Sequence, residues 1–252
     1  EETFNIDVSK IEAAITEKTK AIVPVDLYGQ PCDWAELQEI AKKHDLKIVE
    51  DACQAIGAEY KGTKTGALGD FGCFSLYATK NIMCGEGGVV TTNSDEAAAA
   101  IRSFRQHGMV APYEYADLGY NYRMSDLHGS IAVEQLKKVA SFTKKRQENA
   151  RKLDRALMNI QGITIPTISN NRTHVYHQYT ILLGKGIKRD EFIADLREKG
   201  VGAGIYYPKP LHMYPHIAKL GYKVGDFPVA EDLAARVVSL PVHPKVTDED
   251  IE

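Results

Sequence analysis

Two residues combine side-chain types and a spacing that could do chemistry on an amino group. Asp51 follows the apolar run 46–50, and Lys80 follows the apolar run 71–77. In open parallel sheets, ligands bind beyond the carboxyl ends of the strands, so residues that leave strand ends are the first candidates for a site. The separation of roughly 30 residues is enough to leave one strand and return along its neighbour. A carboxylate and an amine can therefore face one pocket.

Such a pair meets two needs of the cofactor pyridoxal 5'-phosphate. This cofactor requires a lysine amine, a carboxylate against its ring nitrogen and donors for its phosphate group. Lys80 and Asp51 supply the amine and the carboxylate. Ser75, shortly before the lysine, is a candidate phosphate ligand. Gln54 is a candidate donor to the ring hydroxyl group or a packing partner beneath the ring.

Each residue also has a purely structural interpretation. A lysine after a strand is most often a solvated surface residue, and an aspartate at a strand end can simply cap a turn. The glycine-rich run 85–88 can be a flexible turn, because it matches neither the dinucleotide-binding nor the P-loop pattern. Spacing alone leaves both interpretations open.

Alternating strands and helices must position these residues. We expect strands over 21–28, 46–50, 71–77 and 88–92, and helices that begin at Asp33 and Ser94, two residues suited to helix N-caps. The strand–helix–strand unit over 21–50 predicts a right-handed crossover between parallel strands. Residues 1–125 are therefore expected to form a large α/β domain, the cofactor-binding one.

The pattern changes at Ser125. A long helical stretch, broken once, is expected over 125–160. A strand over 174–183, a helix over 190–198, a loop over 206–214 and a last helix over 230–238 should follow. We interpret residues 126–252 as a linking helix and a smaller C-terminal α+β domain.

Bulk composition excludes several functions. The net charge is −3, and 44% of the residues are hydrophobic and 26% charged, as in ordinary globular proteins. The sequence offers no basic face for nucleic acid and no apolar run that could span a bilayer, so we predict neither partner. Cys32, Cys53, Cys73 and Cys84 lack the spacing of a zinc site or a redox pair. We expect small buried thiols in a reducing cytoplasm.

The histidines suggest no metal site. We predict no metal because the spacing required of metal ligands is missing around His107, His128, His216 and His243. His177 and Tyr179 would share one face of the strand over 174–183. Burial in a core or an interface is favoured for them over contact with a substrate.

Five motifs, in the same order along the chain, resemble the nucleotide-sugar aminotransferases of the DegT/DnrJ/StrS type. These motifs lie at Val49–Ala55, Leu68–Ser75, Ala78–Asn81 with Gly85–Gly88, Leu118–Ser125 and Tyr207–His212. The resemblance covers essentially the whole chain. It implies a fold-type-I pyridoxal-phosphate-dependent transferase, with a mainly parallel sheet flanked by helices, and a homodimer with shared active sites.

The resemblance also implies roles for the cofactor-site residues. Lys80 matches the Schiff-base lysine, Asp51 the partner of the pyridine nitrogen, and Gln54 a glutamine that contacts the ring. Ser75 matches a phosphate ligand. Asn121 matches an asparagine that reaches the cofactor phosphate of the neighbouring subunit.

The substrate side is implied by the same resemblance. Tyr207 and His212 match a loop near the substrate. Some sugar dehydratases of this fold carry a histidine at the position of Lys80, so the lysine favours transamination. The implied reaction moves an amino group from an amino acid, which we expect to be glutamate, to a keto sugar linked to a nucleotide.

Two other functions stay open at this point. The first is another activity of the same fold, such as that of a desulfurase or a carbon–sulfur lyase. A desulfurase would need a mobile nucleophilic cysteine, and Cys84 is the only cysteine close to Lys80 in the sequence. A non-catalytic regulator that binds the cofactor or a sugar is the second alternative; the presence of Asp51, Gln54 and Lys80 together argues against it.

Proteins of the resembled type begin with a further segment that includes a phosphate-binding turn at a helix N-terminus. We therefore expect this chain to be a fragment, with an incomplete large domain and only part of the cofactor cradle. The fragment alone is expected to bind the cofactor poorly.

Overall fold

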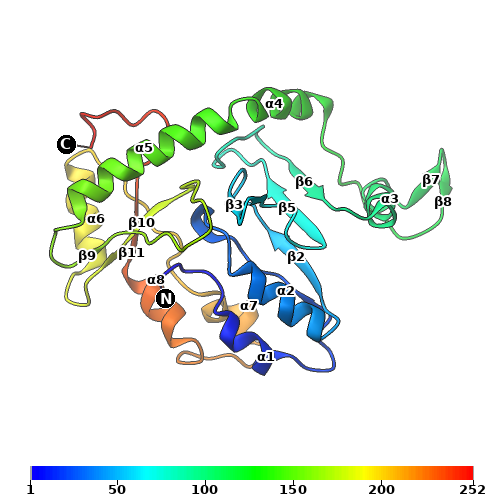
Figure 1. The fold of residues 1–252 in the computed structure, drawn as a ribbon, viewed down its shortest axis with the longest axis horizontal. Helices are drawn as coiled ribbons and strands as arrows, with labels where there is room; N and C mark the ends of the chain where they lie inside the picture. The colour runs from blue at the N-terminus through cyan, green and yellow to red at the C-terminus, as the bar shows by residue number, and fades with distance from the viewer. Residues whose placement is uncertain (1, 252) are drawn as a thin grey trace. The chain divides into compact units, whose positions relative to one another are not determined.

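The computed structural model describes residues 2–251, which form two compact units (Figure 1). The first unit contains residues 5–143 and 170–175. The second unit contains residues 144–169 and 176–251, together with 2–4. The division into domains after residue 125 stays a prediction.

A four-stranded sheet forms the centre of the first unit. Its order is β1 (Ala21–Ile22), β2 (Lys47–Asp51), β5 (Phe71–Ser75) and β6 (Gly88–Thr91). The first three strands run parallel, and β6 pairs antiparallel with β5 at the edge. The predicted parallel strand–helix–strand unit is confirmed.

The strand predicted over 21–28 is too long. Only Ala21–Ile22 pairs continuously with β2, and Val25 adds an isolated bridge to Asp51. The chain then turns into η2 (Leu27–Gly29), where Tyr28 has a φ of 58°. A residue in this left-handed region cannot continue an extended strand, so the apolar run ends in a turn.

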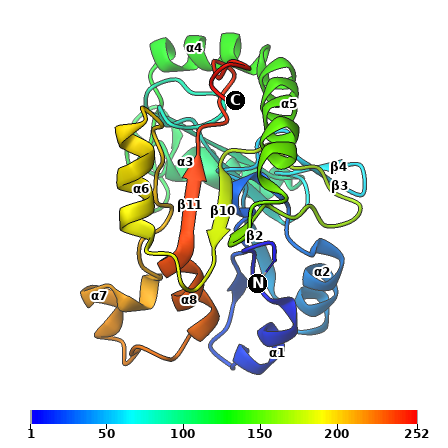
Figure 2. The ribbon, with the colours of Figure 1, turned by 90° about the vertical axis from the view of Figure 1, so that its left-hand side faces the viewer.

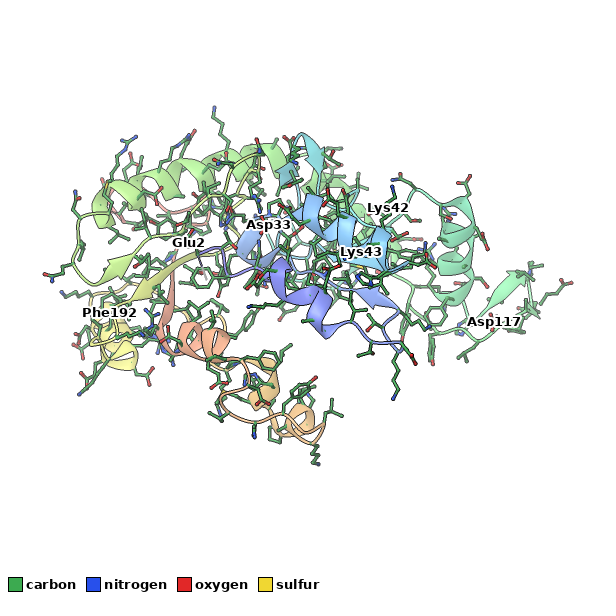
Figure 3. All side chains as sticks on the ribbon, turned by 60° about the horizontal axis from the view of Figure 1, so that its bottom comes forward. Glu2, Asp33, Lys42, Lys43, Asp117 and Phe192 are labelled. Carbon is green, nitrogen blue, oxygen red and sulfur yellow. The ribbon has the colours of Figure 1, made fainter. Side chains whose placement is uncertain are left out.

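Helix α2 (Trp34–Lys43) covers one side of this sheet. Trp34, Leu37 and Ala41 form its buried stripe and pack with Ile22 and Ile48 of the strands. This helical spacing confirms the predicted amphipathic helix. The basic pair 42–43 projects from its last turn (Figure 3), where positive charge is favourable.

The start of α2 differs from the prediction in one detail. Asp33 occupies the N-cap position, but its side chain makes no capping hydrogen bond. Its Oδ1 instead accepts a hydrogen bond from Nη2 of Arg172 at 2.7 Å. The ion pair to a buried guanidinium replaces the local cap.

Both serine caps are confirmed. The hydroxyl of Ser94 accepts from the backbone N–H of Ala97 and begins α3 (Asp95–Phe104). The hydroxyl of Ser125 accepts from the N–H of His128 and begins α4 (Asp126–Leu136). After a short break, α5 (Val139–Leu157) follows, so the helical stretch with one interruption is also confirmed.

The remaining elements of the first unit are short. They are η1 (Val8–Lys10), α1 (Ile11–Ala14), the hairpin of β3 (Glu59–Tyr60) with β4 (Thr63–Lys64), and the hairpin of β7 (Met109–Ala111) with β8 (Glu114–Tyr115).

The second unit has an antiparallel sheet in the order β11-β10-β9, and Figure 2 shows β11 beside β10. Its strands are β9 (Ile163–Thr164), β10 (Tyr179–Leu183) and β11 (Val237–Leu240), and its helices are α6 (Arg189–Glu198), η3 (Leu211–Met213), α7 (Pro215–Ala218) and α8 (Pro228–Arg236). Tyr179, Ile181 and Leu183 of β10 are fully buried in its core.

Two predicted boundaries in this unit are wrong. The last helix ends at Arg236 instead of residue 238, because Val237 and Val238 pair with Leu182 and Ile181 of β10. The strand predicted over 174–183 begins only at residue 179, since Tyr176 has a φ of 46° and interrupts an extended backbone. None of the helices within residues 2–251 is long and apolar enough to cross a membrane.

Candidate functional site

Asp51 stands at the carboxyl end of β2 on a fixed backbone. Its N–H donates to the carbonyl of Pro24 at 2.9 Å, and its carbonyl accepts from the N–H of Asp26 at 3.1 Å. Its half-buried side chain accepts from the N–H of Cys53 through Oδ1 at 3.0 Å. The carboxylate is therefore held in one orientation at the strand end.

Gln54 follows in the turn after β2 and is 7% exposed. Its Oε1 accepts the backbone N–H of Tyr28 at 2.7 Å. Because a backbone donor holds the oxygen, the orientation of the amide is fixed, and its donor atom Nε2 points away from the N–H of Tyr28. The left-handed turn at Tyr28 is thus a support of the site that the sequence pattern did not indicate.

Lys80 lies in the turn that follows β5. Its N–H donates to the carbonyl of Tyr77 at 2.9 Å, and the next side chain, Asn81, is buried and donates from Nδ2 to the carbonyl of Val175 at 3.1 Å. The Lys80 side chain is half-buried, and no carboxylate within residues 2–251 forms an ion pair with it. Asn81 anchors the lysine-bearing turn, a role that sequence reasoning missed.

Asp51 ends β2, and Lys80 follows β5, the parallel neighbour of β2, as the sequence predicted. In the register between β2 and β5, Asp51 lies opposite Cys73, two residues before Ser75. Burial, with a smaller contribution from the neighbouring Asp51 carboxylate, raises the pKa of the Cys53 thiol to about 12, and the Lys80 charge acts in the opposite direction. Because β2 and β5 run parallel, the end of β2 and the turn that follows β5 lie at the same edge of the sheet.

The glycine-rich segment closes the turn behind the lysine. The N–H of Leu76 donates to the carbonyl of Gly87 at 2.9 Å, so the segment returns alongside the end of β5. A Cβ atom at Gly87 would lie 2.7 Å from Sδ of Met124 and 2.8 Å from Sγ of Cys84. Close packing explains the glycine at this position better than flexibility does.

The donor set at this edge fits pyridoxal 5'-phosphate. It offers an amine without an acidic partner among the described residues, a fixed carboxylate, an oriented amide and the half-buried hydroxyl of Ser75. These are the groups that the cofactor requires for its carbonyl carbon, ring nitrogen, ring face and phosphate.

Asn121 makes its contacts with other residues than these groups. It is exposed, pairs through an isolated bridge with Gln106, and its Oδ1 accepts weakly from the N–H of Arg123 at 3.5 Å. Within residues 2–251, no hydrogen bond joins Asn121 to Asp51 or Lys80. Its assignment to a neighbouring subunit's site stays a prediction.

The two predicted substrate residues belong to the second unit. Tyr207 is 51% exposed, whereas His212 is 5% exposed, with its Nε2 2.9 Å from Oε1 of Glu231. Contact with substrate stays a prediction for both.

The other histidines give no sign of a site. His177 is buried, and burial lowers the pKa of His174 to about 3, so that ring is neutral. Within residues 2–251, no group of histidine, cysteine and acidic residues is arranged to hold a metal ion.

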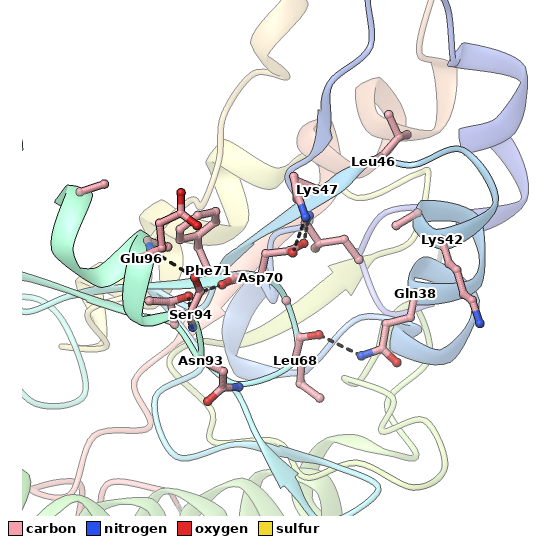
Figure 4. A pocket seen from close by; sticks show the side chains of 16 residues that line it. Gln38, Lys42, Leu46, Lys47, Leu68, Asp70, Phe71, Asn93, Ser94 and Glu96 are labelled. Atoms are coloured by element: carbon pink, nitrogen blue, oxygen red, sulfur yellow. Dashed lines mark hydrogen bonds and ion pairs between the residues drawn. The ribbon is translucent and has the colours of Figure 1, made fainter.

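A separate hollow of about 770 Å³ lies at the opposite end of the sheet (Figure 4). Its lining includes Lys47 at the start of β2 and Phe71 at the start of β5. Lys47 forms an ion pair with Asp70, and Gln38 donates to the carbonyl of Leu68. This hollow is at the amino ends of the parallel strands, away from the edge where ligands bind in such sheets.

Comparison with known proteins gives a consistent result. GDP-perosamine synthase of Caulobacter vibrioides is 38% identical over 99% of this chain and 68% of its own length. The crystal structure of DesV from S. venezuelae has a TM-score of 0.95 and 34% identity over 99% of this chain and 67% of DesV. The structure of Spr1654 from Streptococcus pneumoniae in its PLP form has a TM-score of 0.91 and 28% identity over 99% of this chain and 70% of its own.

The family profile of the DegT/DnrJ/EryC1/StrS aminotransferases matches residues 1–252. This match and the related enzymes confirm the resemblance, the aminotransferase fold and the sheet of mainly parallel strands flanked by helices. The chain belongs to the DegT/DnrJ/EryC1/StrS aminotransferase family.

Proposed function

We propose that the protein transfers an amino group from an amino acid, glutamate, to a keto sugar linked to a nucleotide, with pyridoxal 5'-phosphate as cofactor. The observation that carries the proposal is the position of Asp51 at the carboxyl end of β2 and of Lys80 in the turn that follows β5, the parallel neighbour of β2. Membership of an aminotransferase family supports it. The proposal places the reaction in the cytoplasm, where the four free thiols would stay reduced.

When bound, the cofactor supplies an electron sink for the negative charge left at the α-carbon as its proton departs. Asp51 would hold the proton on the ring nitrogen with a carboxylate that the N–H of Cys53 orients. Gln54 would contact the ring with an amide already oriented by Tyr28. Ser75 would donate its hydroxyl proton to a phosphate oxygen.

Lys80 would carry the cofactor and then move the proton at the substrate carbon. A lysine amine acts as a base only in its neutral form. The lack of an acidic partner within the described residues leaves the amine available for this cycle. The same amine serves both half-reactions, first with the amino acid and then with the sugar.

The remaining assignments concern substrate and assembly. Tyr207 would contact the sugar substrate, and His212 belongs to the same loop. Asn121 would donate to the cofactor phosphate of a neighbouring subunit in a homodimer. Its exposure supports a role outside its own subunit.

The desulfurase alternative finds no support at Cys84. This thiol is 2% exposed and donates to the carbonyl of Glu86 at 3.3 Å. Burial, followed by the Glu86 charge, raises the pKa of Cys84, so the reactive thiolate is disfavoured. A nucleophilic cysteine of a desulfurase must instead be mobile and readily ionised.

The test is covalent labelling of the complete protein. After incubation with pyridoxal 5'-phosphate and reduction with borohydride, peptide mapping should find the pyridoxyl label on Lys80. Glutamate added before reduction should convert the cofactor to its amine form and abolish the label. Lys80→Ala should lose the label and keep the fold, whereas Lys18→Ala, an exposed matched control, should keep both. A label on a different lysine would refute the assignment.

A further inference from the structure

A polar cluster around the buried His212 in the second unit has no part in the steps described so far. His212 donates to or accepts from Oε1 of Glu231 at 2.9 Å. The same carboxylate accepts the backbone N–H of Gly225 at 2.8 Å and that of Phe227 at 3.3 Å. The Phe227 ring lies 4.8 Å from the imidazole ring. We refer to these four residues as the Glu231 cluster.

The carboxylate at the centre of the cluster is an anion. Glu231 lies in the first turn of α8, where the helix dipole favours negative charge. Burial alone would raise the pKa of Glu231, but hydrogen bonds from Gly225, His212 and Phe227 hold it below its ordinary value. Because both backbone donors require the Glu231 carboxylate as acceptor, the His212 ring is best placed as an Nε2–H donor.

The backbone between Tyr207 and His212 has little conformational freedom. Pro208 and Pro210 restrict φ along the connection, and Pro210 has a φ of −65°. The N–H of Met213 donates to the carbonyl of Pro210 at 3.1 Å and closes the η3 turn around His212. A displacement of His212 is therefore transmitted to Tyr207.

We propose that His212 and Glu231 are positioning residues, which hold the loop 206–214 in the conformation that presents Tyr207 to the sugar substrate. The inference rests on the proposed function, because that function assigns Tyr207 to the sugar. It gives His212 an indirect role: the ring is 5% exposed and its Nε2 is engaged by Glu231, whereas Tyr207 is 51% exposed.

Hydrogen–deuterium exchange on the complete protein tests the structural half of this inference. His212→Phe keeps an aromatic ring against Phe227 but removes the donor to Glu231. Exchange in the segments 206–214 and 223–228 should accelerate about tenfold, the effect of losing one hydrogen bond to a charged group. His212→Gln retains an N–H donor and should restore near-native protection.

His216→Phe is the matched control, since this exposed histidine in the same segment has no bond to Glu231. Its exchange should equal that of the wild type. Unchanged protection in His212→Phe, or equal acceleration in His216→Phe, overturns the proposed role of the cluster.

The two half-reactions test the functional half. The complete holoenzyme is converted with glutamate to the amine form and then given UDP-, GDP- and dTDP-linked keto sugars, while the cofactor absorbance is followed. His212→Phe should raise KM for the sugar about tenfold, leave kcat and the glutamate half-reaction within about twofold, and be rescued by His212→Gln. In a Tyr207→Ala background, His212→Phe should cause no further rise in KM for the sugar.

Additive effects of the two changes, or equal slowing of both half-reactions, would overturn the positioning role. A wild-type protein that accepts the amino group but returns it to no sugar of the panel would refute the proposed function, and the role towards the sugar with it. The exchange measurement would still decide whether the cluster holds the loop.

Discussion

The buried carboxyl pair behind Asp51 gives a pH-dependent stability that can be measured. Asp26 and Glu50 are both 0% exposed. Oδ1 of Asp26 accepts from the N–H of Cys32 at 2.8 Å and from Nε1 of Trp34 at 3.2 Å, but its Oδ2 has no donor among the described residues. The two carboxyl groups can bond to each other only when one of them holds a proton.

Desolvation, together with the Glu50 charge, raises the pKa of Asp26 to about 7 from an ordinary value of 3.8. Burial also raises the pKa of Glu50. Between the ordinary pKa of 3.8 and the raised pKa of about 7, Asp26 of the native state holds a proton that the unfolded chain has lost. The free energy of unfolding therefore falls as pH rises through this window, by up to about 1.4 kcal/mol per pH unit.

Asp26→Asn should remove this dependence. The amide oxygen still accepts from Cys32 and Trp34, and the new amide N–H₂ donates to the Glu50 carboxylate without any shared proton. The stability of the variant relative to wild type should therefore rise by on the order of 2–3 kcal/mol from pH 5 to pH 8.

Urea unfolding at pH 5, 6, 7 and 8 measures this difference. The fluorescence of Trp34, the only tryptophan and itself buried beside Asp26, reports on the first unit. Asp45→Asn, the same substitution at an exposed position, should follow the wild-type curve at every pH. A constant difference between Asp26→Asn and wild type across this range would show that no proton is shared, and the reasoning would fail.

Three further predictions concern the site. Asp51→Asn should slow both half-reactions by several powers of ten, because the ring nitrogen loses the charge that keeps it protonated; near-normal turnover in stopped-flow absorbance would make Asp51 structural. Mixing Lys80→Ala with Asn121→Ala protein should, after verified subunit exchange, restore about a quarter of wild-type activity, since half of the dimers are mixed and each has one intact site; no gain would assign Asn121 to its own subunit. Gly87→Ala should destabilise the protein by about 1–3 kcal/mol in urea unfolding, because its Cβ would overlap Met124, and an unchanged midpoint would contradict this packing.

Local signals in the sequence predicted the elements well. Ser94 and Ser125 cap their helices as expected, because the bond of an N-cap spans only three residues. The parallel strands β2 and β5 followed from their apolar runs and the length of the connection between them. The strand-end positions of Asp51 and Lys80 were therefore predictable from the sequence.

Contacts between distant residues explain the errors. Asp33 gives up its capping bond to Arg172, 139 residues further along the chain. Val237 leaves the predicted helix because β10 offers it a backbone partner. The supports of the site, the N–H of Tyr28 under Gln54 and the carbonyl of Val175 under Asn81, are backbone groups and carry no side-chain signature. No pattern of residue types could have indicated them.

The return of segment 170–175 to the first unit has a consequence for synthesis on the ribosome. Val175 packs with Ala55 and Ala58, and its carbonyl receives the side chain of Asn81, 94 residues earlier in the chain. At ordinary rates of translation, the turn that bears Lys80 waits roughly 5 to 20 seconds for this anchor to be made. During that interval, the nascent chain already contains every candidate cofactor-site residue that precedes Val175. The turn that bears Lys80, however, still lacks the hydrogen bond from Asn81 to Val175. Cofactor capture by the nascent chain should therefore begin only after residue 175 has left the ribosome.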